Sequence, residues 1–508
     1  MKKKNTDNKE FRSHKGNKLS AAEKLSLEAR ELAATEQHDD RPSRGFLDVG
    51  LLWPGSYEAG MASLGYLWAM KVLSIPEVTT VHRYFGEPPC WSEGAPALAL
   101  ESRYPLYQMD IVAISVSYEP DILVMLKMLR DAGISEFSNR RDEDDPIVIV
   151  GGPLVRANPS LVVPFGDICI AGDGDGFGGV FGELLRGMGN SYGGKAALME
   201  GLKASPGYVA PELADGITGL GKVLHESVRL PVVSSVIAPR SALGSLRLVE
   251  VTRGCPKQCT FCIGRGSNLS LRQADPALVM SLIPEGTPGL GLVGAAVSYW
   301  SGLEGVLEQA RARGMGIGIS SLRADRLSGE LVGLLASCGT KILTVAADGA
   351  SERMRKKVKK GVSEQHLIDA AGYAKDAGMS AMKVYQMIGL PGEKEADYEE
   401  MAEFCTELSS IIQVVLSASV FVPKRFTPLQ GADFAGTKYM DSVVRYIRGM
   451  LGPGVSMSQV SPREAAMEYL LNRATTADAE AIVELSRTPA RFSDYRSAFA
   501  DRFQLIND

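Results

Sequence analysis

Three cysteines in one short segment are the residues whose type and spacing predict chemistry. Cys255, Cys259 and Cys262 lie in VTRGCPKQCTFCIGRG, spaced C-x3-C-x2-C, directly after an apolar run that predicts a strand. Three thiolates on one loop can bind three corners of a cubane iron-sulfur cluster. Because a 4Fe-4S cluster has four irons, this set leaves one iron open for a substrate or cofactor.

Two alternatives to a cluster are a zinc site without its fourth ligand and unrelated cysteines in a loop. A Cys3His zinc site needs a histidine, and the five histidines of the chain lie elsewhere, at 14, 38, 82, 225 and 366. Zinc sites also more often show paired cysteine spacing. The other four cysteines, at 90, 169, 338 and 405, are scattered, which indicates a reducing compartment rather than a disulfide framework.

Composition limits the class of protein. With 508 residues, 45% of them hydrophobic and 23% charged, the chain resembles a soluble globular protein with more than one core. No apolar run reaches the roughly 18 residues that cross a bilayer, and the basic, polar start is not a secretory signal. A net charge of -5 argues against nucleic-acid binding. We expect a cytoplasmic protein, not bound to a membrane, with a small-molecule or peptide substrate.

The first half of the chain predicts a charged, flexible arm and then an α/β domain. Within the arm, residues 1–45, Ser20 and Glu23 form a capping box that opens a short helix. Over residues 46–190, apolar strands alternate with helical patterns, which predicts a doubly wound, Rossmann-like domain. Its ligand crevice should lie beyond the carboxyl ends of the strands. The candidate strands are FLDVGLLW, DIVAISVSY, IVIVGG and DICIAG.

The second half predicts another α/β unit. Residues 191–240 are rich in glycine and proline and indicate a connector, and residues 431–508 indicate a small helical C-terminal region. Between them, residues 241–430 predict a partial (β/α)6 barrel, whose functional loops should follow the strands. Its six candidate strands are LRLVEVTRG, LGLVGAAV, GIGISSL, KILTVAADG, AMKVYQMIGL and VVLSASVFV.

The segment CPKQCTFC, with an aromatic residue before its last cysteine, resembles the signature of the radical S-adenosylmethionine (radical SAM) superfamily. In that family a 4Fe-4S cluster binds S-adenosylmethionine at its open iron and cleaves it reductively to methionine and a 5'-deoxyadenosyl radical. The resemblance implies that Cys255, Cys259 and Cys262 bind the cluster. It also implies that the backbone around Phe261 lies against the adenine.

Further segments between residues 244 and 430 resemble motifs of the same superfamily. LVGAAVS, which includes Gly294, resembles the glycine-rich segment that holds the amino group, although Ala295 and Ala296 replace its usual acidic residue. SSLRADRLS resembles the strand whose serine and arginine approach the cofactor. These residues would be Ser321 and Arg323.

Three later segments extend the resemblance. ASERMRKKVKKG follows the fourth strand, and of its basic residues only Arg353 is assigned to the cofactor; the others predict a solvated helix face. MIGLPGE resembles the fifth-strand motif against adenine, which implicates Gly389 and Pro391. FVPKRFTPLQG resembles the segment that closes the sixth strand in the methylthiotransferase-like branch.

The domain before the barrel resembles the cobalamin-binding domain of class B radical SAM enzymes. Such domains carry D-x-H-x-x-G after the first strand when they hold cobalt through an imidazole, but this chain has WPGSYEAG. Two alternatives follow. Either cobalamin binds without an imidazole from this loop, or the domain has kept the fold and lost the residue that binds cobalt. GDGDGFGG, with Asp173 and Asp175, predicts an ordinary strand-to-helix turn.

These patterns predict a radical SAM enzyme that modifies an unactivated carbon, with cobalamin-dependent methyl transfer as the first hypothesis. A reduced flavodoxin or ferredoxin-type protein would supply the electron. One alternative is a cobalamin-independent 5'-deoxyadenosyl-radical rearrangement, dehydrogenation or sulfur insertion. Another is a non-catalytic iron-sulfur binding protein. The sequence singles out no catalytic side chain.

Overall fold

The computed structural model describes residues 19–39, 44–188, 194–217, 229–266 and 270–500. The basic start of the chain and His225 lie outside these residues. None of the described helices combines the length and the hydrophobicity that crossing a membrane requires.

A parallel five-stranded sheet forms the N-terminal half. Its strand order is β3-β2-β4-β5-β6, so the strands follow the order 2-1-3-4-5 of flavodoxin-like sheets. This order confirms the predicted doubly wound fold. In such sheets ligands bind beyond the carboxyl ends of the strands, at the point in the sheet where the strand order reverses. The strands are β2 (Leu47–Trp53), β3 (Thr79–Phe85), β4 (Ile111–Ser115), β5 (Ile147–Gly151) and β6 (Ile168–Cys169).

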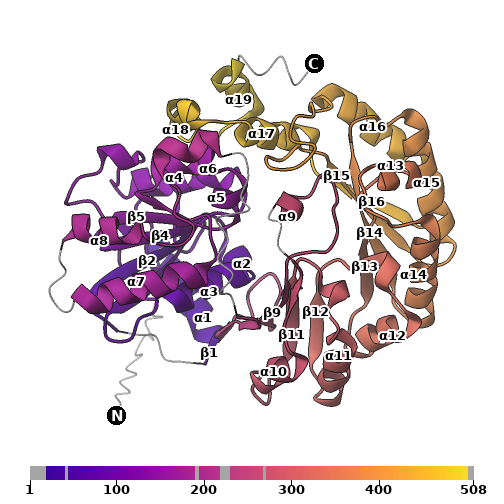
Figure 1. Ribbon diagram of the computed structural model, residues 1–508, viewed down its shortest axis with the longest axis horizontal. Coiled ribbons are helices and arrows are strands. Elements are labelled where there is room, and N and C mark those ends of the chain that lie inside the picture. The colour runs from indigo at the N-terminus through magenta and orange to yellow at the C-terminus, as the bar shows by residue number, and fades with distance from the viewer. Residues whose placement is uncertain (1–18, 40–43, 189–193, 218–228, 267–269, 501–508) are drawn as a thin grey trace, which may run out of the picture.

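Helices cover both faces of this sheet (Figure 1). Along β5, Ile149 packs into the same core as α3 and α7, while Val148 and Val150 pack into the core that contains α4. Because both faces are buried, the strands are apolar throughout. The helices are α2 (Tyr57–Gly60), α3 (Leu64–Leu73), α4 (Asp121–Asp131), α5 (Pro153–Ala157), α6 (Pro159–Val162), α7 (Gly174–Met188) and α8 (Lys195–Leu202).

The N-terminal helix α1 (Ala21–Thr35) packs on this domain instead of extending as a flexible arm. Its predicted capping box between Ser20 and Glu23 is present. Ala29 and Leu32 are buried, and the following strand β1 (Gln37–His38) pairs with β8 (Val236–Ile237). The described part of residues 1–45 therefore differs from the flexible arm that its composition predicts.

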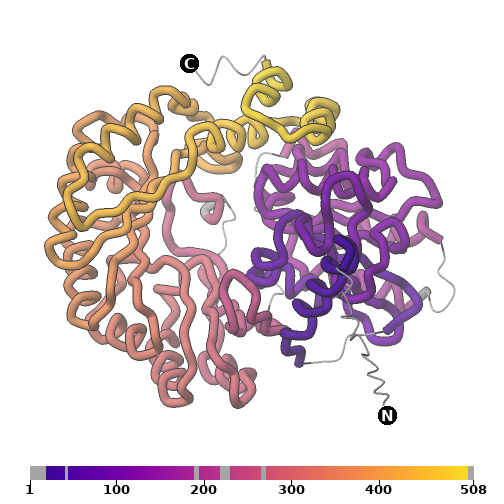
Figure 2. The backbone as a smooth tube through the Cα atoms, turned by 180° about the vertical axis from the view of Figure 1, so that it is seen from behind, coloured from indigo at the N-terminus to yellow at the C-terminus, as the bar shows by residue number. Residues whose placement is uncertain are grey.

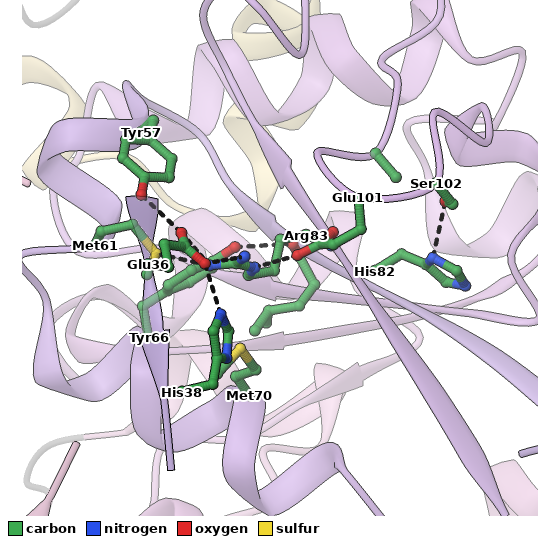
Figure 3. Close-up of polar contacts among 12 residues, drawn as sticks. Glu36, His38, Tyr57, Met61, Tyr66, Met70, His82, Arg83, Glu101 and Ser102 are labelled. Atoms are coloured by element: carbon green, nitrogen blue, oxygen red, sulfur yellow. Dashed lines mark hydrogen bonds and ion pairs between the residues drawn. The ribbon is translucent and has the colours of Figure 1, made fainter. Parts of the chain in front are cut away.

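A buried ion pair fastens the end of α1 to the sheet edge. Both carboxylate oxygens of Glu36 accept hydrogen bonds from the Arg83 guanidinium, at 2.9 and 2.7 Å (Figure 3). Tyr57 donates a further hydrogen bond to Glu36 at 2.7 Å, and Glu101 pairs with the other side of Arg83. Arg83 lies on β3, a strand that the sequence patterns do not predict, since His82 and Arg83 interrupt the apolar run.

The predicted barrel strands are all present. Neighbouring strands pair in parallel from β9 to β11 and β12, and from β13 to β15, and the bridge between Leu322 and Val345 links the two groups. This arrangement confirms the partial (β/α)6 barrel. The strands are β9 (Arg247–Arg253), β11 (Gly289–Gly294), β12 (Gly316–Ile319), β13 (Ile342–Ala346), β14 (Ala381–Ile388) and β15 (Val414–Val420).

Short additional strands flank the barrel. Antiparallel to β9 run β7 (Val232–Val233) and β10 (Arg272–Gln273), and β16 (Val455–Gln459) adds in parallel to β15. The sequence predicts only helices for the region that contains β16. The barrel helices are α9 (Ile263–Gly266), α10 (Pro276–Ser281), α11 (Leu303–Ala312), α12 (Gly329–Ser337), α13 (Glu352–Lys357), α14 (Glu364–Asp376) and α15 (Glu395–Ser409).

The C-terminal helices cross from the barrel to the N-terminal half, as the yellow end of the chain shows in Figure 2. Arg130 donates to the Ser486 carbonyl at 2.8 Å, and Asn158 donates to the Leu471 carbonyl at 3.2 Å. The two halves are thus joined a second time, far from the connector. These helices are α16 (Thr437–Met450), α17 (Pro462–Asn472), α18 (Ala479–Leu485) and α19 (Phe492–Ala498).

Replacing Glu36 by glutamine should lower the free energy of unfolding by about 3 kcal/mol, because it leaves a buried guanidinium only partly neutralised. Burial acts to raise the pKa of Glu36, but the charge and hydrogen bonds of Arg83, with hydrogen bonds from His38 and Tyr57, lower it to about 2. The stabilisation is therefore present above the pKa of an unfolded glutamate and is lost as the pH falls from about 4.5 toward 2. Urea unfolding at pH 7 and at pH 3 measures both effects.

The matched control is Glu200→Gln, which removes an exposed partner of Lys203 and should cost less than about 1 kcal/mol. Equal losses for both variants would show that the pair between Glu36 and Arg83 does not stabilise the fold.

Candidate functional site

The cysteine loop begins where β9 ends, at the end of the barrel that faces the N-terminal half (Figure 1). Cys255 is half-buried, Cys259 is buried and Cys262 is exposed. Within the described residues, no three histidine, cysteine or acidic side chains converge on a single metal ion. A cubane cluster instead offers a separate iron to each thiolate, so its ligands do not have to converge on one point.

The loop is held against the segment that follows α13. The amide of Thr260 donates to the Val358 carbonyl at 3.0 Å, and Cys259 Sγ lies 3.7 Å from the Lys359 carbonyl oxygen. Burial raises the pKa of the Cys259 thiol, whereas the charges of Lys360 and Arg323 act in the opposite direction. These cations would stabilise a thiolate, which is the form that binds metal.

Arg323 and Ser321 follow β12, beside the same loop. Arg323 Nη2 donates to the Lys360 carbonyl at 2.6 Å, and its Nε donates to Asp325 at 2.9 Å. Ser321 is exposed. The structure therefore brings Arg323 close to Cys259 and leaves the Ser321 side chain open to solvent.

Gly294, at the end of β11, lies where the sheet leaves no room for a side chain. A Cβ atom at this position would lie 2.2 Å from Thr252 Oγ1. The register between β11 and β9 also shifts at this residue. Only glycine allows this approach to the strand that leads into the cysteine loop, which gives Gly294 a structural role whether or not it touches a cofactor.

Phe261 and the turn after β14 meet in one small apolar cluster. Phe261 packs with Leu390, Met354 and Phe421. Gly389, with φ of +86°, and Pro391 flank Leu390. The predicted adenine-binding residues are thus neighbours in space, and their contacts with a cofactor stay a prediction.

Arg353 lies on the outer side of this turn. It pairs with Asp397 and donates to the Gly392 carbonyl at 3.0 Å, and 47% of its side chain is exposed. These contacts fasten the turn between β14 and α15. Arg355 and Lys360, which are predicted to be solvated, are instead buried, so that prediction is wrong for these two residues.

A cavity of about 850 Å³ lies between the cysteine loop and the carboxyl ends of the N-terminal strands. Cys255, Gly254 and Gly264 line it from the barrel side. Its apolar floor contains Leu51 and Phe177 from the N-terminal domain. The size is typical of a small-molecule or cofactor site. The crevice predicted from the doubly wound fold therefore opens toward the cysteine loop.

The cavity wall carries buried polar groups that lack partners. Trp68 Nε1, Arg156 Nε and one carboxylate oxygen each of Asp173 and Asp175 have no hydrogen-bond partner among the residues that the structure describes. Arg253, two residues before Cys255, forms ion pairs with Asp173 and with Glu250. Buried polar groups without partners are uncommon in folded proteins, so these atoms indicate a polar ligand.

A second polar group lines the same cavity, and no sequence pattern brings its residues together. Lys424 lies 2.6 Å from both Glu119 and Glu468, and Tyr118 donates to Glu468 at 2.6 Å. These residues come from the loop after β4, the segment after β15, and α17. Because three distant segments supply them, neither spacing nor periodicity could group them.

Two families match the chain, and one range lies mainly in each half. The family described as "Radical SAM proteins, N-terminal" matches residues 87–211, and the one described as "Radical SAM superfamily" matches residues 249–405. The chain belongs to the radical SAM superfamily. The second range contains the whole cysteine loop. Membership of the radical SAM superfamily implies a 4Fe-4S cluster and S-adenosylmethionine as cofactors.

Two relatives that the chain matches are distant in sequence. An uncharacterized protein of Methanocaldococcus jannaschii is 25% identical over 393 residues, which are 76% of this chain and 80% of that protein. An uncharacterized methyltransferase of Pyrococcus horikoshii is 23% identical over 59% of this chain and 67% of its own.

A solved structure of the cobalamin-dependent radical enzyme OxsB, with aqua-cobalamin bound, aligns with 14% identity and a TM-score of 0.47. The alignment covers 74% of this chain and 53% of OxsB, so the chain spans about half the length of that protein.

Glu393, in the turn after β14, should make stability depend on pH. Burial raises its pKa to about 7, although Tyr398 and the amides of Gly389 and Leu390 donate to it. The favourable contribution of protonated Glu393 to the free energy of unfolding is present below about pH 4.5 and is lost as the pH rises through 7. Relative to the native chain, Glu393→Gln should therefore gain about 1–3 kcal/mol between pH 5 and pH 8.

Denaturant unfolding across this pH range measures the difference. The control is Glu407→Gln, which removes an exposed carboxylate from α15. A constant difference between Glu393→Gln and the native chain would contradict the raised pKa.

Proposed function

We propose that this radical SAM enzyme binds a 4Fe-4S cluster through Cys255, Cys259 and Cys262 and cleaves S-adenosylmethionine to modify an unactivated carbon. Methyl transfer that uses a cobalamin bound in the cavity is the first version of the reaction. The name of the Pyrococcus relative, an uncharacterized methyltransferase, agrees with this version.

One observation carries the proposal: a single cavity is lined both by Cys255 and by the ends of the N-terminal strands. Ser115 ends β4 and Gly151 ends β5, and both line this space. A ligand of the doubly wound domain and a cofactor at the cluster would therefore face one another without intervening protein. Enzymes gain rate by holding reacting groups at such close range.

The chain's own residues hold and shield the reacting groups. When bound, the cluster and S-adenosylmethionine supply a one-electron cleavage of the sulfonium bond. Lys360 and Arg323 lie near Cys259, where their charges favour its thiolate. Phe261 and Leu390 offer an apolar surface for an adenine ring. The apolar floor with Leu51 and Phe177 limits water in the cavity, which protects a radical from side reactions.

A cobalamin fits the cavity wall by its chemistry. Its amide side chains and phosphate offer donors to Asp173 and Asp175 and acceptors to Trp68 and Arg156, whose buried atoms lack partners within the described part of the chain. Within the described residues, the loop at 53–60 does not line the cavity, and neither does any histidine. The chain would therefore hold the corrinoid without an imidazole bond to cobalt.

Cys259→Ala should abolish the cluster and the cleavage of S-adenosylmethionine, because two cysteines cannot hold the cubane in place. The native chain, reconstituted under anaerobic conditions, should contain about four irons and release 5'-deoxyadenosine with dithionite. Iron analysis, absorbance near 400 nm, roughly the region of iron-sulfur charge transfer, and chromatography measure these outcomes.

The matched control is Cys338→Ala. Cys338 is a buried cysteine at the end of α12, outside the site, and its loss should leave cluster content and cleavage unchanged. A native chain that holds a cluster but releases no 5'-deoxyadenosine would favour a non-catalytic iron-sulfur protein.

Gly151→Phe should weaken corrinoid binding by at least about tenfold, a loss of 1.4 kcal/mol or more. No atom of the described residues lies within 4 Å of a Cβ at Gly151, so the new ring would project into the cavity without straining the sheet. Equilibrium dialysis of the anaerobic holoprotein with aquacobalamin measures the affinity.

Gly179→Phe is the control, since Gly179 is exposed on α7 and also has open space at its Cβ. If the native chain binds no corrinoid yet releases 5'-deoxyadenosine, the cobalamin-independent reaction replaces methyl transfer.

A further inference from the structure

The segment that supports the cysteine loop is strongly basic. Six of the eight residues in RMRKKVKK, from Arg353 to Lys360, are arginine or lysine. The whole chain has a net charge of -5, so this concentration of positive charge is a local feature. Such a feature indicates a specific role beyond the solubility that scattered lysines provide.

Two of the six cations have structural roles inside the fold. The Arg355 side chain is 1% exposed and donates to the Val362 carbonyl at 3.0 Å. Lys360 is also buried, and it pairs with Asp348. These two residues hold the segment in place.

The other four cations face solvent. Arg353 pairs with Asp397, and Lys356 pairs with Glu352. Within the described part of the chain, neither Lys357 nor Lys359 has a carboxylate partner; Lys357 donates to the Pro391 carbonyl. The exposed surface therefore keeps an excess of positive charge. We call the exposed side chains of Arg353, Lys356, Lys357 and Lys359 the basic face.

The basic face lies directly outside the cysteine loop. The carbonyl of Lys359 contacts Cys259 Sγ at 3.7 Å, and that of Val358 accepts from Thr260. Helix α13 and helix α9 lie at the same end of the barrel (Figure 1). The rate of electron transfer falls steeply with distance. The basic face is a favourable entry point for an electron because Lys359, one of its residues, contacts the predicted cluster ligand Cys259.

The cavity cannot serve as this entry point. Its volume of about 850 Å³ suits a cofactor and a small substrate, not a protein domain. Of the described residues, none between 353 and 360 lines it. A carrier protein at the basic face would thus leave the cavity free for S-adenosylmethionine and the substrate.

We infer that the basic face is the docking surface for an acidic one-electron carrier protein. The inference rests on the proposed function. The carrier loses one electron and is oxidised, and the cluster gains that electron and is reduced, so no proton has to move. Opposite charges steer such encounters and raise association rates by roughly 10- to 1,000-fold at low salt. Without local positive charge, two acidic proteins would repel one another.

The test replaces Lys356 and Lys359 together by glutamate. Neither residue is among the predicted cofactor contacts, and both are exposed. Lys359 contacts Cys259 only through its backbone carbonyl, which the substitution leaves in place. With reduced flavodoxin as an acidic donor, the rate of 5'-deoxyadenosine formation at low salt should fall at least about tenfold. With dithionite, a small donor that needs no docking surface, the rate should stay within about twofold of the native rate.

A second variant controls for net charge. Lys24→Glu with Lys203→Glu makes the same change in charge at exposed positions of the N-terminal half and should keep the native rate with flavodoxin. Rising ionic strength should lower the rate of 5'-deoxyadenosine formation by the native chain with flavodoxin, because salt screens exposed charges. The difference in rate between the native chain and the Lys356 and Lys359 variant should therefore become smaller.

Three outcomes would overturn the inference. Equal rates with flavodoxin for the native chain and the Lys356 and Lys359 variant would exclude the basic face. Equal losses in the two double variants would assign the effect to net charge, and a parallel loss with dithionite would assign it to damage at the cluster. Absence of 5'-deoxyadenosine from the native chain with dithionite would instead overturn the proposed function and this inference together.

Discussion

The contacts between the cysteine loop and residues 358–360 determine how the rest of the site is arranged. A backbone hydrogen bond from Thr260 and the contact of Cys259 with Lys359 hold the loop at the end of the barrel. With that side of the loop covered, Cys255 is left to face the cavity. One set of local contacts thus separates a surface side from a cavity side, and the proposed electron entry and the proposed chemistry use one side each.

Ion pairs across the cavity hold the N-terminal domain and the barrel in a fixed relative position. Arg253 joins the strand before the loop to Asp173 of the N-terminal domain, and Lys424 joins the barrel to Glu119. These ion pairs are partly buried, where a charge without a partner is costly. Their value lies in geometry, because they fix the distance between the cysteine loop and the carboxyl ends of the N-terminal strands.

The sequence predicts elements well where the pattern of apolar residues is unbroken. All six barrel strands and the doubly wound domain follow from such runs, and the capping box at Ser20 follows from local chemistry. Strand β3 is missed because Arg83 is buried in it, and the partners that make this burial possible lie far away in sequence. Strand β16 is missed because it alternates serine with apolar residues within a region of helical patterns.

The same limit applies to the site. The cysteine motif is local, so spacing alone locates the loop. The cavity is formed by segments from both halves, and no spacing in the chain brings Lys424 next to Glu468. Periodicity also could not distinguish the buried Arg355 from the exposed Lys356 beside it. Tertiary packing decides which of several basic neighbours turns inward.

The crossing of the C-terminal helices to the N-terminal half has a consequence for how large molecules reach the cavity. Two domains that are joined by one linker can move apart by rotating about that linker. Here the C-terminal helices make a second connection, through hydrogen bonds from Arg130 to the Ser486 carbonyl and from Asn158 to the Leu471 carbonyl. A wide separation of the two halves would break this second connection. Entry and exit must therefore rely on small movements of loops at the rim, which favours slow exchange of a resident cofactor and a narrow size range for the substrate.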